Sequence, residues 1–483
     1  MGSQGSLIGV AAIAAEAARV ARPRHLPTAS EIGARLDRLP ATRHVWFLII
    51  CLSLGGFFEF YDLFFTGYVA PGLFREGILT PTTPGLFGTS GIASFIAALF
   101  AGLFIGTMVF GFVADRFGRR AIFTFSLLAY TICSVAMAFQ TTAFGLNLWR
   151  FLAGVGIGVE LVTIDTYISE LAPIELRGRA FAVNQAIQFS AVPVIAFLAY
   201  ALVPLDPLGL PGWRWLVLIG AVSALFVWWL RRAVPESPRW LAAHGRLEEA
   251  ERITAALERR VQAEYGKALP PPLPHPAPPP GRGRFLEMFS GVYRNRTIML
   301  VIFNIFQTVG FYGFANWVPT LLISQGVDVT RSLEYTFIIA IASPFGPALG
   351  YLLADRAERK WQIVAAAAGI AIFGLCFAGA RGGVPLIIFG VLLTLASNLL
   401  SYAFHAYQPE LYPTRIRAMA VGFVYSWSRL SAVFTAFVIA FFLGRFGTTG
   451  VFTLIAGSML IVALAIALMG PRTRDLPLER ISQ

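Results

Sequence analysis

Charged side chains are scarce in this sequence. Asp, Glu, Lys and Arg supply 13% of the 483 residues, whereas apolar residues supply 57%. This shortage of charge excludes an ordinary soluble protein of the same length. Twelve membrane helices of about 20 to 23 residues would need about 240 to 276 residues, which is close to the apolar content of the chain. The composition therefore predicts a polytopic membrane protein.

Cysteine is scarce too, with three in the whole chain. Cys51, Cys133 and Cys376 all lie in apolar stretches, which gives neither a disulfide framework nor a metal-binding spacing. No nucleophile and base stand at a usable spacing either. We therefore expect no enzymatic activity, no metal and no cofactor.

Long apolar runs, in contrast, are abundant. Their lengths predict an all-α membrane protein with twelve transmembrane helices. The runs cover roughly residues 45–70, 91–114, 121–140, 146–169, 181–203, 213–231, 298–322, 334–354, 361–380, 384–408, 419–443 and 450–470. We accordingly divide the chain into a tail (1–44), a six-helix bundle (45–233), a polar and proline-rich central loop (234–297), a second six-helix bundle (298–470) and a second tail (471–483).

The basic residues fall in alternate loops. With both termini in the cytoplasm, the inner segments hold 31 Lys and Arg and the outer loops hold five. Lys and Arg concentrate on the cytoplasmic side of membrane proteins, so we expect both termini to be cytoplasmic. The membrane thus accounts for the net charge of +12, and we expect no nucleic-acid partner.

The two halves share charged motifs at an offset of 240 residues. Transporters built from duplicated halves place their substrate site between the halves near the midplane. Opposite charges at the cytoplasmic helix ends are expected to pair and latch one conformation, although the arginines would also suit a purely topological role. The proposed gate residues are Asp115, Arg119, Glu170 and Arg177 in the first half and Asp355, Arg359, Glu410 and Arg417 in the second.

Asp165 and His405 also stand 240 residues apart, near the cytoplasmic ends of the fourth and tenth runs. A histidine opposite a carboxylate could relay protons or close an inner gate. The alternative is a buried histidine that hydrogen-bonds to the backbone.

Ionisable residues inside a membrane span are costly and are therefore functional candidates. Glu59 and Asp62 share one face of the first run, where two carboxylates in a low dielectric would load and release a proton near neutral pH. A rise of about 1.5 Å per residue places Asp62 and Arg150 at the same depth, about 6 Å below the outer edge. We expect these two residues to pair, either for proton coupling or as a structural ion pair.

Arg429 lies near the midplane of the eleventh run, which contains no acidic residue. It would bind a substrate carboxylate bidentately, or alternatively pair with a carboxylate of the first or fourth run. Other polar residues would line the cavity or bridge helices by hydrogen bonding. These candidates are Gln188, Gln307, Tyr312, Asn316, Asn398 and Tyr402. The abundant phenylalanines are expected mostly to face lipid.

Four motifs together resemble the major facilitator superfamily. They are GFVADRFGRR (111–120), the R-x-x-x-G-x-G-x-G pattern that starts at Arg150, PESPRWL (235–241) and PELYPT-x-x-R (409–417). Within it the chain resembles the sugar-transporter-like bacterial metabolite:proton symporters of the inner membrane. The resemblance implies that Asp62 couples protons with Arg150 as its partner, and that Arg429 binds carboxylates.

Two departures from sugar carriers argue against a hexose substrate. Asp165 stands where they have a proline, and Gln307 is followed by Thr308 where they have a second glutamine. We therefore predict a monomeric alternating-access carrier that imports a small organic anion with protons across a bacterial inner membrane. The alternatives are a proton-driven efflux antiporter for amphiphilic compounds, a sugar or polyol symporter, and a receptor without transport.

Overall fold

The computed structural model describes the backbone of residues 27–80, 83, 91–117, 119–173, 175–222, 234–272, 284–353 and 357–473. Within these ranges it leaves out the side chains of residues 109–117, 119, 120, 123, 159–163, 165, 166, 292, 351, 353, 414, 415, 417 and 418.

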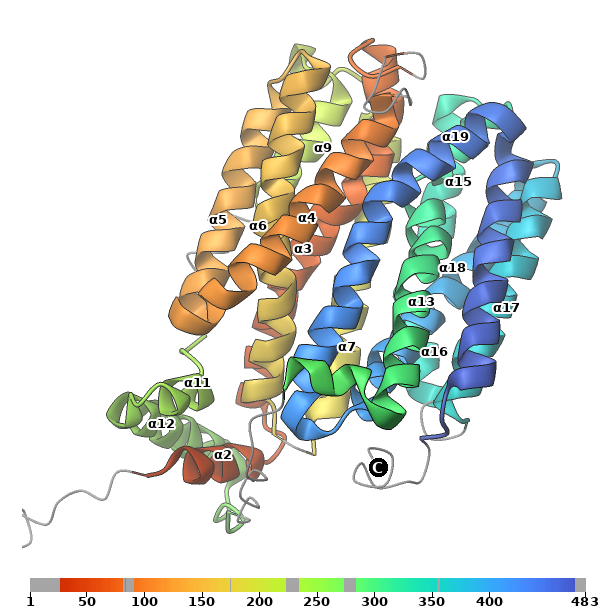
Figure 1. The fold of residues 1–483 in the computed structure, drawn as a ribbon. Helices are drawn as coiled ribbons and strands as arrows, with labels where there is room; N and C mark the ends of the chain where they lie inside the picture. The colour runs from red at the N-terminus through yellow and green to blue at the C-terminus, as the bar shows by residue number, and fades with distance from the viewer. Residues whose placement is uncertain are drawn as a thin grey trace, which may run out of the picture.

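The described residues form helices and connecting segments, with no strand among them (Figure 1). The first half contains α2 (Ala29–Asp37), α3 (Arg43–Arg75), α4 (Gly91–Phe117), α5 (Arg119–Ala138), α6 (Ala143–Leu171), α7 (Arg177–Phe189), α8 (Ala191–Leu202) and α9 (Gly212–Gly220). The central segment contains α11 (Pro238–Ala243) and α12 (Leu247–Tyr265). The second half contains α13 (Gly291–Ala315), α14 (Val318–Ser324), α15 (Val329–Ala340), α16 (Phe345–Leu353), α17 (Arg359–Gly379), α18 (Gly383–Tyr407) and α19 (Thr414–Met469).

The helices stand in two bundles, one for each half of the chain (Figure 1). Eight helical stretches of the described chain are long and apolar enough to cross a membrane. One of them, in α19, contains both the eleventh and the twelfth expected spans, which meet at a bend where Gly447 has a φ of 64°. The third and fourth expected spans correspond to α5 and α6, and α9 begins the sixth. The predicted all-α membrane fold is therefore confirmed.

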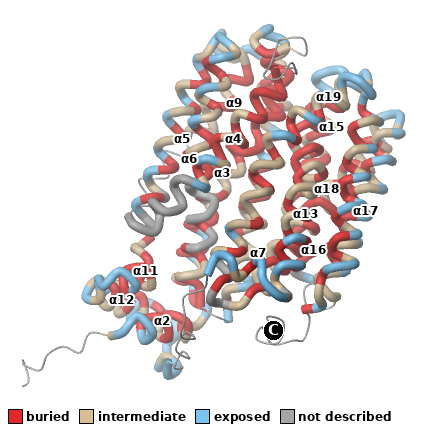
Figure 2. Tube along the Cα trace, in the orientation of Figure 1, coloured by how far each residue is buried: buried red, intermediate tan, exposed pale blue. Residues whose placement is uncertain are grey.

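Glycines allow the helices of the first bundle to pack closely. A Cβ at Gly154 of α6 would lie 2.4 Å from the Leu99 carbonyl oxygen of α4, and one at Gly158 would lie 2.4 Å from that of Leu103. Small residues at such spacing let membrane helices approach to backbone contact. The repeated glycines after Arg150 therefore fix α6 against α4 and hold the Arg150 side chain inside the bundle. Buried residues gather in the same way where helices face one another (Figure 2).

A small helical unit caps one end of the first bundle, which we call the lower end; the opposite end is the upper end (Figure 1). It consists of α2, α11 and α12, so the tail and the central segment pack together. Arg35 of α2 and Arg38, the residue that follows α2, each bind the Glu258 carboxylate of α12 at 2.6 Å. Burial alone would raise the pKa of Glu258, but these hydrogen bonds outweigh burial and hold it below its usual range. The boundaries of the five segments into which we divided the sequence (1–44, 45–233, 234–297, 298–470 and 471–483) stay a prediction.

The two bundles touch at their upper ends. The rings of Phe197 in α8 and Phe337 in α15 have centroids 5.4 Å apart. Gly67 of α3 lies directly against the backbone of Asn316 at the end of α13, where an added Cβ would be 2.2 Å from the carbonyl oxygen. These contacts join the two halves at the upper end.

Candidate functional site

Asp62 and Arg150 form a buried ion pair inside the first bundle. Arg150 Nη1 lies 2.8 Å from Asp62 Oδ2, and Ser134 of α5 donates a hydrogen bond of 3.1 Å to Asp62 Oδ1. Arg150 Nη2 also donates to the Asp62 carbonyl oxygen at 2.5 Å and to the Thr66 hydroxyl. The Phe65 ring covers the guanidinium at 4.2 Å. The sequence predicted this proximity; the role of the pair in proton coupling stays a prediction.

A central cavity of about 80 Å³ lies between the two bundles. Four of the polar residues proposed for substrate binding line it, namely Gln188, Gln307, Tyr312 and Arg429. The remaining walls are Phe60, Leu63, Phe64, Gln185, Phe189, Phe303, Phe311, Leu400, Ser401, Phe404, His405, Tyr425 and Ser428. Both halves of the chain contribute, as expected for a site between duplicated bundles.

Arg429 is the cationic group of this cavity and is 2% exposed. Its Nη1 donates to the Tyr312 hydroxyl and its Nη2 to the Tyr425 hydroxyl, each at 3.1 Å. Nε is buried without a hydrogen-bond partner in the described part of the chain. The guanidinium also lies 4.9 Å from the centroid of the Tyr425 ring. The two neutral tyrosine hydroxyls thus orient the Arg429 guanidinium, and its Nε can still donate a hydrogen bond to a ligand.

Glu59 lies one helical turn before Asp62 and is fully buried. The direct hydrogen-bond partners of Arg429 are the hydroxyls of Tyr312 and Tyr425, and the alternative pairing of Arg429 with a first-run carboxylate stays a prediction.

Three predicted substrate residues do not line the central cavity, and their role in substrate binding stays a prediction. Asn316 ends α13 at the upper contact with Gly67. Asn398 donates a hydrogen bond of 2.9 Å to the Ser343 carbonyl oxygen and faces a second cavity nearer the upper end. Tyr402 packs its ring against Gly350 of α16. For Asn398 and Tyr402 the position on the helix decides this, because α18 turns these two side chains toward Ser343, which lies between α15 and α16, and toward α16.

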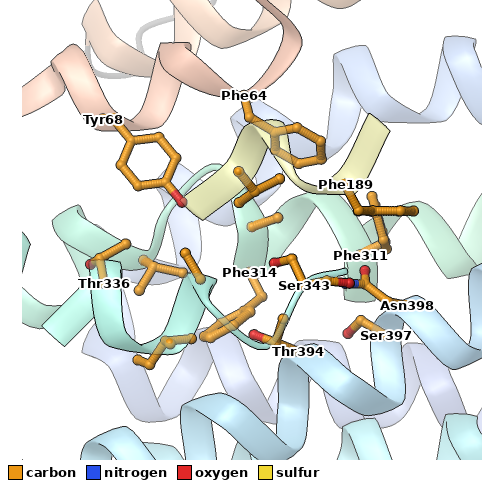
Figure 3. Close-up of a pocket in the computed structure, with 15 residues that line it drawn as sticks. Phe64, Tyr68, Phe189, Phe311, Phe314, Thr336, Ser343, Thr394, Ser397 and Asn398 are labelled. Carbon is orange, nitrogen blue, oxygen red and sulfur yellow. The ribbon is translucent and has the colours of Figure 1, made fainter. Parts of the chain in front are cut away.

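The second cavity is largely apolar and adjoins the first (Figure 3). Phe64, Phe189 and Phe311 line both cavities and stand between them. The Phe311 ring has its centroid 6.3 Å from those of Phe64 and Phe189, in edge-to-face contact with each. The expectation that phenylalanines mostly face lipid is therefore wrong for this group. With 42 phenylalanines in the chain, no sequence signal separates those that line the cavity.

Comparison with known proteins agrees with this architecture. The family model described as "Sugar (and other) transporter" matches residues 48–483. The chain belongs to this family. It is 31% identical over 450 residues to the putative metabolite transport protein YyaJ of Bacillus subtilis, covering 92% of this chain and 96% of YyaJ. It is 27% identical over 452 residues to the niacin transporter NiaP of Acinetobacter baylyi, covering 93% of this chain and 99% of NiaP.

Among solved structures, the chain resembles the xylose transporter XylE from E. coli with a TM-score of 0.71 and 19% identity, covering 90% of this chain and 99% of XylE. A second structure of XylE describes it as a major facilitator superfamily proton:xylose symporter. The protein is therefore a transporter and not an enzyme, and it has the fold of this major facilitator superfamily symporter. No group of three or more metal-ligating side chains occurs among the residues that the structure describes.

The residues proposed as gates are described in part. Arg359 forms an ion pair with Glu410 in the second half. In the first half, Arg177 binds Asp37 of α2 at 3.0 Å, and Arg239 of α11 donates to the Glu170 carbonyl oxygen at 3.0 Å. The side chains of Asp115, Arg119, Asp165, Asp355 and Arg417 lie outside the described residues.

One feature of the lower end was not anticipated by the sequence, and one stated alternative is found near it. Asp37 receives Arg239 at 2.5 Å as well as Arg177, so the tail helix takes part in the charge network. His405 Nδ1 lies 2.7 Å from the Ser401 carbonyl oxygen, which is the backbone-bonded alternative, while its ring also lines the central cavity. The gating roles of these residues stay proposals.

Proposed function

We propose that this transporter imports a small organic anion together with protons by alternating access. The buried Arg429 in the central cavity is the observation that supports this most directly. Its hydrogen-bond partners in the described chain are two tyrosine hydroxyls, so its charge is available to a ligand. A planar guanidinium in a site that excludes water matches a carboxylate bidentately.

The cavity walls favour a flat, unsaturated body on that anion. Phe60, Phe189, Phe303, Phe311 and Phe404 present rings to the same space as Arg429. Rings stack favourably on other rings, face to face with an offset or edge to face. An aromatic monocarboxylate satisfies both the cation and the rings. The relative NiaP is a niacin transporter, and niacin is a carboxylate on an aromatic ring. Gln307 and Gln188 would fix its orientation.

The Asp62–Arg150 pair supports coupling to protons. Protonation of Asp62 would weaken its hold on Arg150, and Glu59 supplies a second carboxylate one turn away. We propose that this release permits the bundles to tilt, while the charged residues at the lower end open and close the inner side. From the distribution of basic residues, we place the lower end in the cytoplasm of a bacterium and the transporter in its inner membrane.

The test compares a carboxylate with its neutral isostere. Purified protein is titrated with benzoate, benzamide and xylose, and the titration is repeated on Arg429→Gln and on Arg381→Gln, which removes an exposed arginine outside the cavity. Benzoate is expected to bind and benzamide and xylose to bind far more weakly. Loss of charge-assisted hydrogen bonds of about 3 kcal/mol predicts roughly 100-fold weaker benzoate binding in Arg429→Gln and no change in Arg381→Gln.

Other results would sink the proposal. Equal binding of benzoate and benzamide, or unchanged benzoate affinity in Arg429→Gln, would contradict an anion site at Arg429. Xylose binding in place of benzoate would favour a sugar symporter. In proteoliposomes, benzoate uptake without proton movement would refute symport, and proton-driven extrusion would favour the efflux antiporter.

A further inference from the structure

The second cavity, of about 40 Å³, lies on the upper side of the central one. Helix α18 lines both, with Ser401 at the central cavity and Ser397, four residues earlier, at the second. Four residues rise about 6 Å along an α-helix. The two cavities therefore follow one another along α18, about one helical turn apart.

The Ser397 hydroxyl is a buried polar group of the second cavity. Ser397 is 5% exposed, and its Oγ has no hydrogen-bond partner among the residues that the structure describes. Other buried helical serines donate their hydroxyl to the carbonyl oxygen four residues earlier, as Ser53 does to Ile49 at 2.8 Å and Ser458 to Leu454 at 2.9 Å. A buried hydroxyl without a partner is unfavourable, so the Ser397 hydroxyl marks a place for a hydrogen-bonding group of a ligand.

Two neighbouring polar groups of this cavity are already engaged. Asn398 Nδ2 donates to the Ser343 carbonyl oxygen at 2.9 Å, and the Thr336 hydroxyl donates to the Ser332 carbonyl oxygen at 2.6 Å. Apolar side chains make up most of the remaining lining (Figure 3). One water-sized group needs about 10 to 15 Å³ of such space, so the cavity has room for roughly two or three non-hydrogen atoms. It fits a small substituent and not a whole substrate.

The register of α18 and α19 places Arg429 about one turn below Ser397. The rings of His405 in α18 and Tyr425 in α19 have centroids 5.7 Å apart, so these two residues share a level. The two helices run in opposite directions, so Ser401 stands about one turn above His405 and Arg429 about one turn above Tyr425. Arg429 is thus level with Ser401, and Ser397 is one turn nearer the upper end.

The rings of Phe64, Phe189 and Phe311 separate the two cavities. Phenylalanine rings carry no polar atom, so no hydrogen bond holds these three rings in place and they can turn to admit a flat ligand. An aromatic acid whose carboxylate binds Arg429 would lie among these rings. The far end of its own ring would then point toward Ser397.

We propose that the second cavity is a subsite for a small hydrogen-bonding substituent on the substrate ring, opposite the carboxylate, with the Ser397 hydroxyl as its partner. The proposal rests on the proposed function of Arg429 as the anion site. The two groups of a para-substituted ring are separated by a length close to one turn of helix. A hydroxyl in that position both donates and accepts, so it can bond to Ser397 in either direction. The substrate class is thereby narrowed to aromatic monocarboxylates with a small polar group at the far end of the ring.

The experiment compares two substituents of similar size. Binding of benzoate, 4-hydroxybenzoate and 4-methylbenzoate to the purified full-length protein is measured for the wild type and for Ser397→Ala. The wild type is expected to bind both substituted acids at least as tightly as benzoate, because the second cavity has room for either group. Ser397→Ala is expected to lower the ratio of the 4-hydroxybenzoate affinity to the 4-methylbenzoate affinity about tenfold, because the ligand hydroxyl loses its partner.

Two further variants isolate the hydrogen bond. Ser458→Ala is the matched control, since it removes an equally buried hydroxyl outside both cavities, and it is expected to leave the ratio unchanged. Ser397→Cys replaces the hydroxyl by a weak donor of similar shape and is expected to lower the ratio as well. A fall in Ser397→Ala together with an unchanged ratio in Ser397→Cys would assign the effect to added space and contradict the subsite.

The remaining outcomes separate this subsite from the anion site. If none of the three acids binds the wild type, the anion site at Arg429 is wrong and the subsite is wrong with it. If Arg429→Gln weakens all three acids but Ser397→Ala leaves the ratio unchanged, the anion site stands and the subsite is refuted. Much weaker binding of both substituted acids than of benzoate to the wild type would refute the subsite too, because the second cavity would then not admit a substituent.

Discussion

The Asp62 carboxylate is bound by side chains from two other helices of its own bundle. Ser134 of α5 and Arg150 of α6 each donate to one oxygen, and both members of the ion pair are almost fully buried. Removing one partner of such a pair leaves an uncompensated charge, which is more costly than losing a surface ion pair. The pair therefore affects the stability of the first bundle as well as its proposed proton chemistry.

Asp62→Asn should separate these two effects. It leaves Arg150 buried without a carboxylate, so the unfolding free energy is expected to fall by about 3 kcal/mol. Because asparagine imitates the protonated acid, exchange of substrate across the membrane is expected to persist, while accumulation driven by a pH gradient is lost. Denaturant unfolding, counterflow and driven uptake in proteoliposomes measure the three quantities.

Ser134→Ala is the control for that variant. It removes one hydrogen bond to the carboxylate and leaves the ion pair, so about 1 kcal/mol of stability is expected to be lost, with driven uptake retained. Driven uptake by Asp62→Asn at the rate of Ser134→Ala would contradict a coupling role for Asp62.

For single residues, the positions of charged side chains could be predicted from the sequence better than the positions of aromatic rings. The depth count along two helices placed Asp62 beside Arg150, because an ionised side chain in a membrane helix must find a partner at its own depth. Arg429 stood out for the same reason. Phe189 and Phe311 could not be selected, since an apolar ring is equally favourable against lipid and against a cavity. The position of Asn398 outside the central cavity could not be predicted, because hydrogen-bonding groups serve helix contacts as well as ligands.

Among the elements, the tail helix α2 is the one whose position the sequence did not reveal. The start of this helix can be predicted from the sequence, because Thr28 and Glu31 form a capping box there. Its docking depends on ion pairs between segments more than 200 residues apart, such as Arg35 with Glu258 at a separation of 223 residues. Spacing within a helix carries no information about such a pairing, so only the three-dimensional structure shows it.

Glu258 of α12 should control this docking. Three hydrogen bonds from two arginines end on its carboxylate, so Glu258→Gln is expected to weaken the contact by about 1.5 kcal/mol. Backbone amides of α2 would then exchange with solvent roughly tenfold faster. Hydrogen exchange followed by mass spectrometry measures this, with the exposed Glu248→Gln of the same helix as the matched control.

The pH dependence of this contact follows from the lowered pKa of Glu258. A carboxyl whose pKa is lower in the folded state stabilises the fold fully above its unfolded pKa of about 4.3 and loses that contribution as the pH falls through the folded value. The difference in α2 exchange between wild type and Glu258→Gln is therefore expected to be constant above about pH 5 and to vanish in more acidic solution. A difference that grows on acidification would contradict this assignment.

For the molecule as a whole, the duplicated motifs predicted the two bundles but not the contact between the bundles at the upper end. The 240-residue offset implied two equivalent bundles, and the ion pair of Arg359 with Glu410 joins two of the repeated motifs. The upper contact escaped prediction because its members belong to no repeat. Gly67 has Gln307 at the equivalent position. Asn316 was visible only as a candidate for substrate binding, and Phe337 only as an ordinary residue of an apolar run. Packing between halves depends on shape, which a charge pattern does not encode.

Gly67→Ala tests whether this upper contact is part of the transport cycle. The added methyl would meet the Asn316 backbone at 2.2 Å from its carbonyl oxygen, and backbone cannot move aside as a flexible side chain would. The bundles are then expected to be held apart at the upper end, so uptake falls at least tenfold while benzoate binding in detergent stays within a few-fold of wild type. Gly422→Ala in α19 adds the same methyl to open space and is expected to transport normally. Equal uptake by the two variants would show that the upper contact need not close for transport, and that α3 and α13 can separate without loss of the cycle.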